Sequence, residues 1–156
     1  MTAKRKAYVI ISWVLVAAVM IFIFLMSSAN ADDSDGMSDS LLMKIIELTG
    51  IEFTSHFIRK AAHFSEFAAL SFLLSNAIFA TFNSKKATVF AFIGASAYAV
   101  TDELHQLFSD GRACRVTDIL IDSSGALLGA IIFSLFILIY IKHTERKHNN
   151  GNIKTV

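Results

Sequence analysis

The stretch DSSGALLGAIIFSLFILIYIK, residues 122–142, decides the fold class of this chain. The 19 residues between Asp122 and Lys142 carry no charge. A helix that crosses the hydrocarbon core of a bilayer, roughly 30 Å thick, needs about 20 predominantly apolar residues. We therefore predict a membrane-spanning helix at about residues 119–141, with Asp118 and Asp122 at its start.

The composition of the whole chain agrees with a membrane protein. Of its 156 residues, 54% are hydrophobic and only 17% are charged, whereas soluble domains carry about 25% charged residues. The net charge of +1 gives no basic field for nucleic acid, so no nucleic-acid partner is predicted. The single cysteine, Cys114, excludes an internal disulfide framework and a cysteine-based zinc site.

Three further spans are predicted at about residues 8–26, 61–82 and 87–108. The first is uncharged, whereas the other two reach spanning length only if polar residues at one end are included. Ala29-Asn30-Ala31 resembles a signal-peptidase site after the first span. Because the apolar core of a signal peptide is usually about 7–15 residues long, we expect this longer segment to be retained as a span.

Lysine and arginine predict the orientation of these spans, because cytoplasmic loops are enriched in them. They precede the first span, separate the second from the third, and follow the fourth, as Lys4, Arg5, Lys6, Lys85, Lys86, Lys142, Arg146, Lys147 and Lys154. Four spans place all three groups on one side. We therefore expect a multi-pass protein of the cell membrane, with both termini and the tail 142–156 in the cytoplasm.

The external segment between the first two spans contains a predicted short helix. Its apolar residues share one helical face: Leu41, Leu42, Ile45, Ile46 and Leu48. Ser38 or Asp39 is predicted to cap its start, and Gly50 to close its end. This helix either lies on the outer membrane surface or packs on the spans. The predicted fold is thus all-α and polytopic, a single domain over residues 1–156 with four transmembrane helices and an external interfacial helix.

The polar ends of the last three spans all fall on the external side. Helical spacing puts Arg59, His63 and Glu66 on one face of the second span, and Asp102, His105 and Gln106 on one face of the third. On the fourth, a small-residue stripe would carry two carboxylates toward its neighbours. The predicted outward-facing polar pocket comprises Arg59, Lys60, His63, Glu66, Asp102, Glu103, His105, Gln106, Arg112, Asp118 and Asp122.

Two interpretations of this pocket stay open. Ionisable groups at membrane depth are costly unless they pair or line a wet cavity. The charges therefore either neutralise one another and hold the helices together, or they form a ligand site.

Three motifs in this region resemble those of the VanZ-like family of bacterial membrane proteins. They are RKAAHFSEFAAL, DELHQLFSDGR and DILIDSSGALLG, in that order, and Ser27 and Ser28 match a position where the family has serines. Asp110 stands where the family commonly has proline, and Phe67 where an aromatic hydroxyl is common. The resemblance implies a role in the bacterial cell envelope, because the founding member is associated with resistance to glycopeptides, chiefly teicoplanin. Expected partners are membrane lipids and an envelope ligand or lipid-linked precursor.

Three kinds of chemistry are compatible with these residues, so whether the chain is an enzyme stays open. Arg59 and Arg112 suit a phosphate or carboxylate, which arginine binds bidentately. Alternatively, His63 or His105 beside a carboxylate serves as general base on a lipid-linked or phosphorylated substrate. A metal would use His63, Glu66, Asp102 and His105. Because this spacing is common by chance, no metal or other cofactor is predicted.

Overall fold

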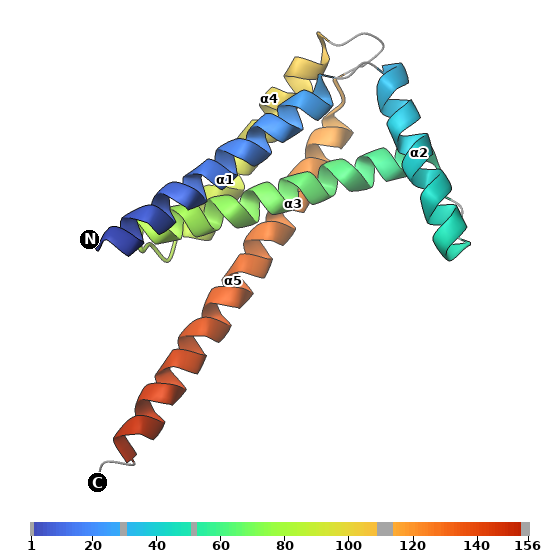
Figure 1. Ribbon diagram of the computed structural model, residues 1–156. Coiled ribbons are helices and arrows are strands. Elements are labelled where there is room, and N and C mark those ends of the chain that lie inside the picture. Colours follow the sequence, from blue (N-terminus) through green and yellow to red (C-terminus); the bar gives the residue numbers. More distant parts are fainter. Residues whose placement is uncertain (1, 29–30, 51–52, 109–113, 154–156) are drawn as a thin grey trace.

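The computed structural model describes residues 2–28, 31–50, 53–108 and 114–153. These residues form five α-helices and no strand, which confirms the all-α prediction (Figure 1). The helices are α1 (Ala3–Ser27), α2 (Ala31–Thr49), α3 (Ser55–Phe82), α4 (Ala87–Gln106) and α5 (Val116–Ile153).

Local signals in the sequence explain where α1 and α3 begin and where α3 ends. The side chains of Thr2 and Thr54 accept hydrogen bonds from the backbone amides three residues later, at 3.4 Å and 3.2 Å. Threonine is a favoured N-cap for this reason. Asn83 follows α3 in the left-handed conformation, with φ +49°, and its amide donates to the Phe79 carbonyl. Asparagine tolerates this conformation better than most residues, so it ends the helix.

Three of the described helices are long and apolar enough to cross a membrane: Ala3–Ser27, Ser55–Phe82 and Val116–Thr144. They correspond to the first, second and fourth predicted spans and extend each of them. The helix of the third predicted span, α4, is not among them. Helix α5 also continues to Ile153, through most of the predicted tail. The chain is therefore a membrane protein by the character of these helices.

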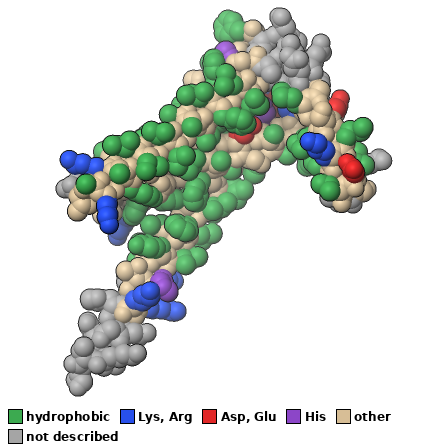
Figure 2. All heavy atoms as spheres, viewed as in Figure 1, with side chains coloured by type: hydrophobic (Ala, Val, Ile, Leu, Met, Phe, Trp, Pro, Cys, Tyr) green, Lys and Arg blue, Asp and Glu red, His purple; other side chains and the backbone are tan. Residues whose placement is uncertain are grey.

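Helix α3 is the centre of the arrangement, since it contacts α1, α2, α4 and α5. Alanines let α4 approach its neighbouring helices closely, because Ala91, Ala95 and Ala99 recur about every turn and are fully buried. The apolar core contains Val16, Ile23, Phe67, Leu70, Ala77, Ala95, Ala99 and Ala126. Large apolar side chains also cover much of the outer surface, as a lipid-facing surface requires (Figure 2).

The small-residue stripe of α5 makes a close contact with the backbone of α3. A Cβ atom at Gly125 would lie 2.2 Å from the carbonyl oxygen of Phe64, and one at Gly129 would lie 2.0 Å from that of Ala68. Only glycine fits at such distances. The stripe therefore brings α5 against α3, as its spacing predicts.

Helix α2 differs from its prediction at one end. It begins at Ala31, so the predicted cap at Ser38 or Asp39 is wrong. No proline interrupts the segment, and the single Gly36 disfavours a helix by only about 1 kcal/mol. The predicted end is correct, because Gly50 has φ +68° and its amide donates to the Ile46 carbonyl at 2.8 Å. Asp39 instead accepts a hydrogen bond from Ser55 at the start of α3.

Candidate functional site

Asp102, in the last turn of α4, is the best-anchored member of the predicted pocket. It is buried, and its Oδ2 accepts hydrogen bonds from Ser27 Oγ at 2.8 Å and from Gln106 Nε2 at 3.2 Å. Ser27 ends α1, 75 positions earlier in the chain. Both donors fix the orientation of the carboxylate, so the site includes a fourth helix that the helical spacing alone did not indicate.

His63 on α3 and Asp122 on α5 meet Asp102 at this point. One ligand-type atom of each residue lies within 4.8 Å of those of the other two. Asp122 is 2% exposed. Its position follows from the glycine contact, because Gly125 lies about one turn further along α5 and holds this helix against the backbone of Phe64, the residue after His63.

Two glutamates complete the interior of the site. Glu66 lies about one turn after His63 and is half-buried, and its Oε2 is buried without a hydrogen bond among the described residues. Glu103 is 1% exposed, and its Oε1 accepts a hydrogen bond from the backbone amide of Arg115 at 2.6 Å. We call His63, Glu66, Asp102, Glu103 and Asp122 the inner cluster.

Gln106 is buried beside Asp102, and the other described members of the predicted pocket form a rim: Arg59, Lys60, His105 and Asp118. Lys60 forms an ion pair with Asp118 at 2.7 Å, and both are about a quarter exposed. Arg59 Nη2 lies 3.2 Å from His56 Nδ1. His105 turns to α1, where its Nε2 is 3.0 Å from Ser28 Oγ.

The ring of His105 also stacks on Phe24, with centroids 4.5 Å apart. The four residues predicted as possible metal ligands therefore do not all lie together. His105 is on the rim, whereas Asp122 lies with His63 and Asp102. Arg112, Asp110 and Gly111 lie outside the described residues.

The site is rich in acid. The described members of the predicted pocket include five carboxylates but two basic side chains, those of Arg59 and Lys60. Chemically, the inner cluster offers oxygen acceptors and one imidazole, which suit amide, hydroxyl or ammonium groups, or a cation.

A family model described as VanZ/LLP1 matches residues 12–138. The chain belongs to the VanZ/LLP1 family. The match runs from α1 to α5 and therefore includes every helix that contributes to the site. No curated protein and no solved structure matches the chain.

In this VanZ-like protein, the pair Ser27-Ser28 was the clearest sign in the sequence that α1 contributes to the site. Ser27 contacts Asp102, and Ser28 contacts His105. The hydrogen bond from the Arg115 backbone amide to Glu103 could not be predicted in this way, because nearly every residue has a backbone amide, whatever its side chain.

Proposed function

We propose that this chain is an envelope membrane protein whose inner cluster and rim bind the polar part of an envelope ligand from the outer side. The observation that carries this proposal is the convergence of His63, Asp102 and Asp122, from three helices, on one buried place.

The charge balance favours a ligand over a purely structural role. A set of charges that only holds helices together is expected to be balanced, because unpaired charge at membrane depth is costly. Among the described residues of the inner cluster and rim, five carboxylates outnumber the basic side chains, even when the neighbouring Arg115 is added to Arg59 and Lys60. The ligand would therefore present amide, hydroxyl or ammonium groups to the inner cluster, and its phosphate or carboxylate to Arg59 and Arg112. A contribution to teicoplanin resistance belongs to the same proposal, as an expectation from the family resemblance.

The proposed topology has four spans, with α4 as the third and both termini in the cytoplasm. The 20 residues of α4 give a length of about 30 Å at 1.5 Å per residue, which matches the hydrocarbon thickness. Helix α2 would lie on the outer membrane surface. Its Met43 and Leu48 are 72% and 84% exposed, as expected of side chains that enter the interface.

A fusion experiment tests this topology. A reporter enzyme that is active only outside the cytoplasm should be silent when fused after Val156, and active when inserted after Gly50, between α2 and α3. The second fusion is the control for expression. Strong activity after Val156 would contradict the four-span arrangement.

Ligand binding is tested by purification from bacterial membranes in a mild detergent, followed by mass spectrometry of the bound molecules. We expect a polar envelope lipid or lipid-linked precursor with the wild-type protein, and a loss of at least about tenfold with Asp102→Asn, which alters a buried charged hydrogen-bond acceptor. Lys6→Ala, at the opposite end of α1, is the matched control and should retain the ligand. Equal recovery from Asp102→Asn and wild type would contradict the proposal.

A second candidate function is supported by the composition of the same three residues. One imidazole and two carboxylates are a ligand set of catalytic metal sites, which keep a further position open for water or substrate. The hydrogen bonds from Ser27 and Gln106 to Asp102 are the kind of outer contact that orients such ligands. The chain would then be an enzyme acting on a lipid-linked or phosphorylated envelope substrate, with His63 as general base if no metal takes part.

Metal analysis separates this candidate from simple ligand binding. After exposure to Zn²⁺ or Mn²⁺ and removal of excess ions, the purified protein should retain about one ion per chain. His63→Ala should lose it, whereas His105→Ala should keep it, because His105 lies with Ser28 and Phe24. Retention by both variants, or no retention by the wild type, would reject a metal at this position.

A further inference from the structure

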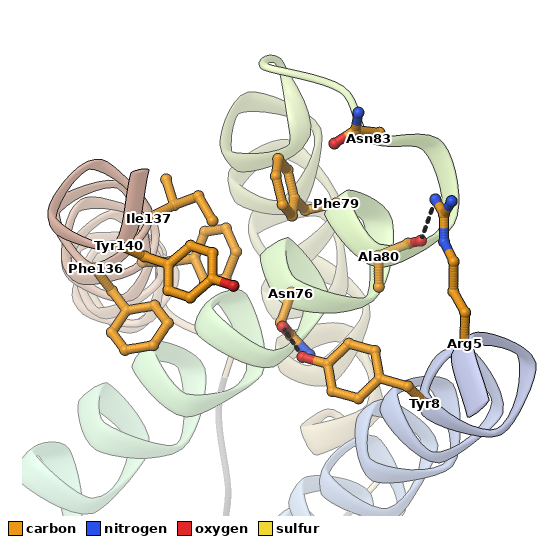
Figure 3. Close-up of a pocket in the computed structure, with 10 residues that line it drawn as sticks. Arg5, Tyr8, Asn76, Phe79, Ala80, Asn83, Phe136, Ile137 and Tyr140 are labelled. Atoms are coloured by element: carbon orange, nitrogen blue, oxygen red, sulfur yellow. Dashed lines mark hydrogen bonds between the residues drawn. The ribbon is translucent and has the colours of Figure 1, made fainter. Parts of the chain in front are cut away.

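A cavity of about 550 Å³ lies at the opposite end of the helices from the inner cluster. It is lined by the first turns of α1, the last turns of α3 and the middle of α5, and it is open on one side (Figure 3). The first turn of α1 and the loop between α3 and α4 lie at this end (Figure 1), and both segments carry basic residues.

The packing of α5 explains why a cavity opens here. At Gly125 and Gly129, α5 touches the backbone of α3. Further along, an aromatic residue takes the place of glycine. The ring of Phe133 packs edge-on against Phe72 and Phe79, with centroids 5.5 Å and 6.2 Å away. Helix α5 therefore diverges from α1 toward its C-terminal end, and the gap widens (Figure 1).

The cavity has an apolar side and a polar side. Phe79, Phe136 and Ile137 form much of the apolar side. On the polar side, Tyr8 and Asn76 point toward one another, and the Tyr8 hydroxyl donates to Asn76 Oδ1 at 2.7 Å (Figure 3). The amide of Asn76 donates in turn to Ser12 Oγ at 3.1 Å. Tyr8, Asn76 and Ser12 are thus hydrogen-bonded to one another. Among the residues that line the cavity, Arg5 carries the positive charge.

Arg5 supplies a cation at the edge of the cavity. Its Nη2 donates to the Ala80 carbonyl at 3.4 Å, and the guanidinium has five N–H donors in all. None of the described side chains that line the cavity is acidic. Lys4, Lys6 and the pair after α3 add positive charge at the same end. An anionic group beside Arg5 would therefore meet attraction without a competing carboxylate.

We propose that this cavity binds one anionic phospholipid, with its phosphate at Arg5 and part of an acyl chain between α1, α3 and α5. Basic pockets between transmembrane helices on the cytoplasmic side bind anionic headgroups. Arginine grips phosphate through two parallel hydrogen bonds. The volume is within the range of about 300–1,000 Å³ for small-molecule sites, and in a bilayer the apolar walls are covered by lipid chains. The proposal concerns a different site from the inner cluster, and it rests on the proposed topology, which puts this end of the helices on the cytoplasmic side.

Native mass spectrometry of the delipidated full-length protein tests the proposal, with phosphatidylglycerol and phosphatidylcholine of identical chains as probes. We expect one phosphatidylglycerol to bind more tightly than phosphatidylcholine. Arg5→Ala should weaken phosphatidylglycerol by about fivefold or more and remove the preference, since one basic residue near an anionic lipid contributes roughly that factor. Lys4→Ala removes the same charge from the neighbouring position outside the lining, and should have a smaller effect.

A second pair of variants tests the acyl-chain part. Ile137→Trp fills the gap without a change of charge, and should weaken both lipids. Ala80→Leu narrows the same space from α3 and serves if the tryptophan variant does not fold. Equal affinity for the two lipids, equal effects of Arg5→Ala and Lys4→Ala, or undiminished binding to a folded filled variant would each overturn the proposal.

Discussion

Gly129→Ala is expected to destabilise the folded protein more than an alanine at any other glycine in the described part of the chain. The added Cβ would lie 2.0 Å from the carbonyl oxygen of Ala68, which belongs to the backbone of α3 and cannot rotate away. The two helices must separate, and the contacts along their shared face are lost. We expect a loss of about 3 kcal/mol or more in the free energy of unfolding in detergent, at the upper end for overpacking.

The chain contains a matched control for this change. Gly36, in α2, has nothing within 4 Å of a built Cβ atom. Gly36→Ala should therefore leave stability unchanged or raise it by up to about 1 kcal/mol, the difference in helix propensity. Thermal unfolding of both variants in one detergent checks the pair. If Gly129→Ala unfolds at the same temperature as the wild type, α5 does not pack on α3 through this stripe.

The glycine stripe is also the part of the fold that the sequence predicted best. Its spacing, with Asp118 and Asp122 on the same face, indicated both a close helix contact and the side of α5 that carries the acids. Apolar runs likewise located three helices that can span a membrane. Helix ends were harder to predict. The start of α2 was misplaced because a good N-cap residue at Ser38 or Asp39 predicts a helix start even where the helix already runs through it.

For the candidate site, the sequence identified residue types and depth, but did not identify partners. From the sequence, His63 and His105 were equally good candidates for the site. Their roles diverge because the rotation of α4 buries Asp102 between Ser27 and the residues of α3 and α5, whereas His105 meets α1 alone, at Ser28 and Phe24. Helix rotation is set by the packing of whole faces, which spacing within one helix does not describe. The cavity at the basic end was missed for a related reason, since the divergence of α5 depends on how Phe133 packs against α3.

Replacing Asp122 by asparagine is expected to separate binding from stability. The change keeps the shape of the side chain and removes one charge from the acid-rich inner cluster. If the cluster is a ligand site, the free energy of unfolding of the variant should lie within about 1 kcal/mol of the wild-type value or exceed it, because the change removes a buried negative charge that is in excess. Its bound envelope ligand should nevertheless be lost. Asp39→Asn is the control, because it removes the charge of one carboxylate outside the inner cluster and the rim, and it should keep the ligand.

The most direct test of the proposed ligand site is therefore to measure bound ligand and thermal unfolding on the same purified Asp122→Asn sample. The site predicts a folded protein, at least as stable as the wild type, that has lost the ligand by about tenfold or more. The opposite result is a protein that keeps its ligand but loses about 3–5 kcal/mol of stability, as expected when one partner of a buried ion pair is removed. That result would show that the inner cluster holds the helices together and does not bind an envelope ligand.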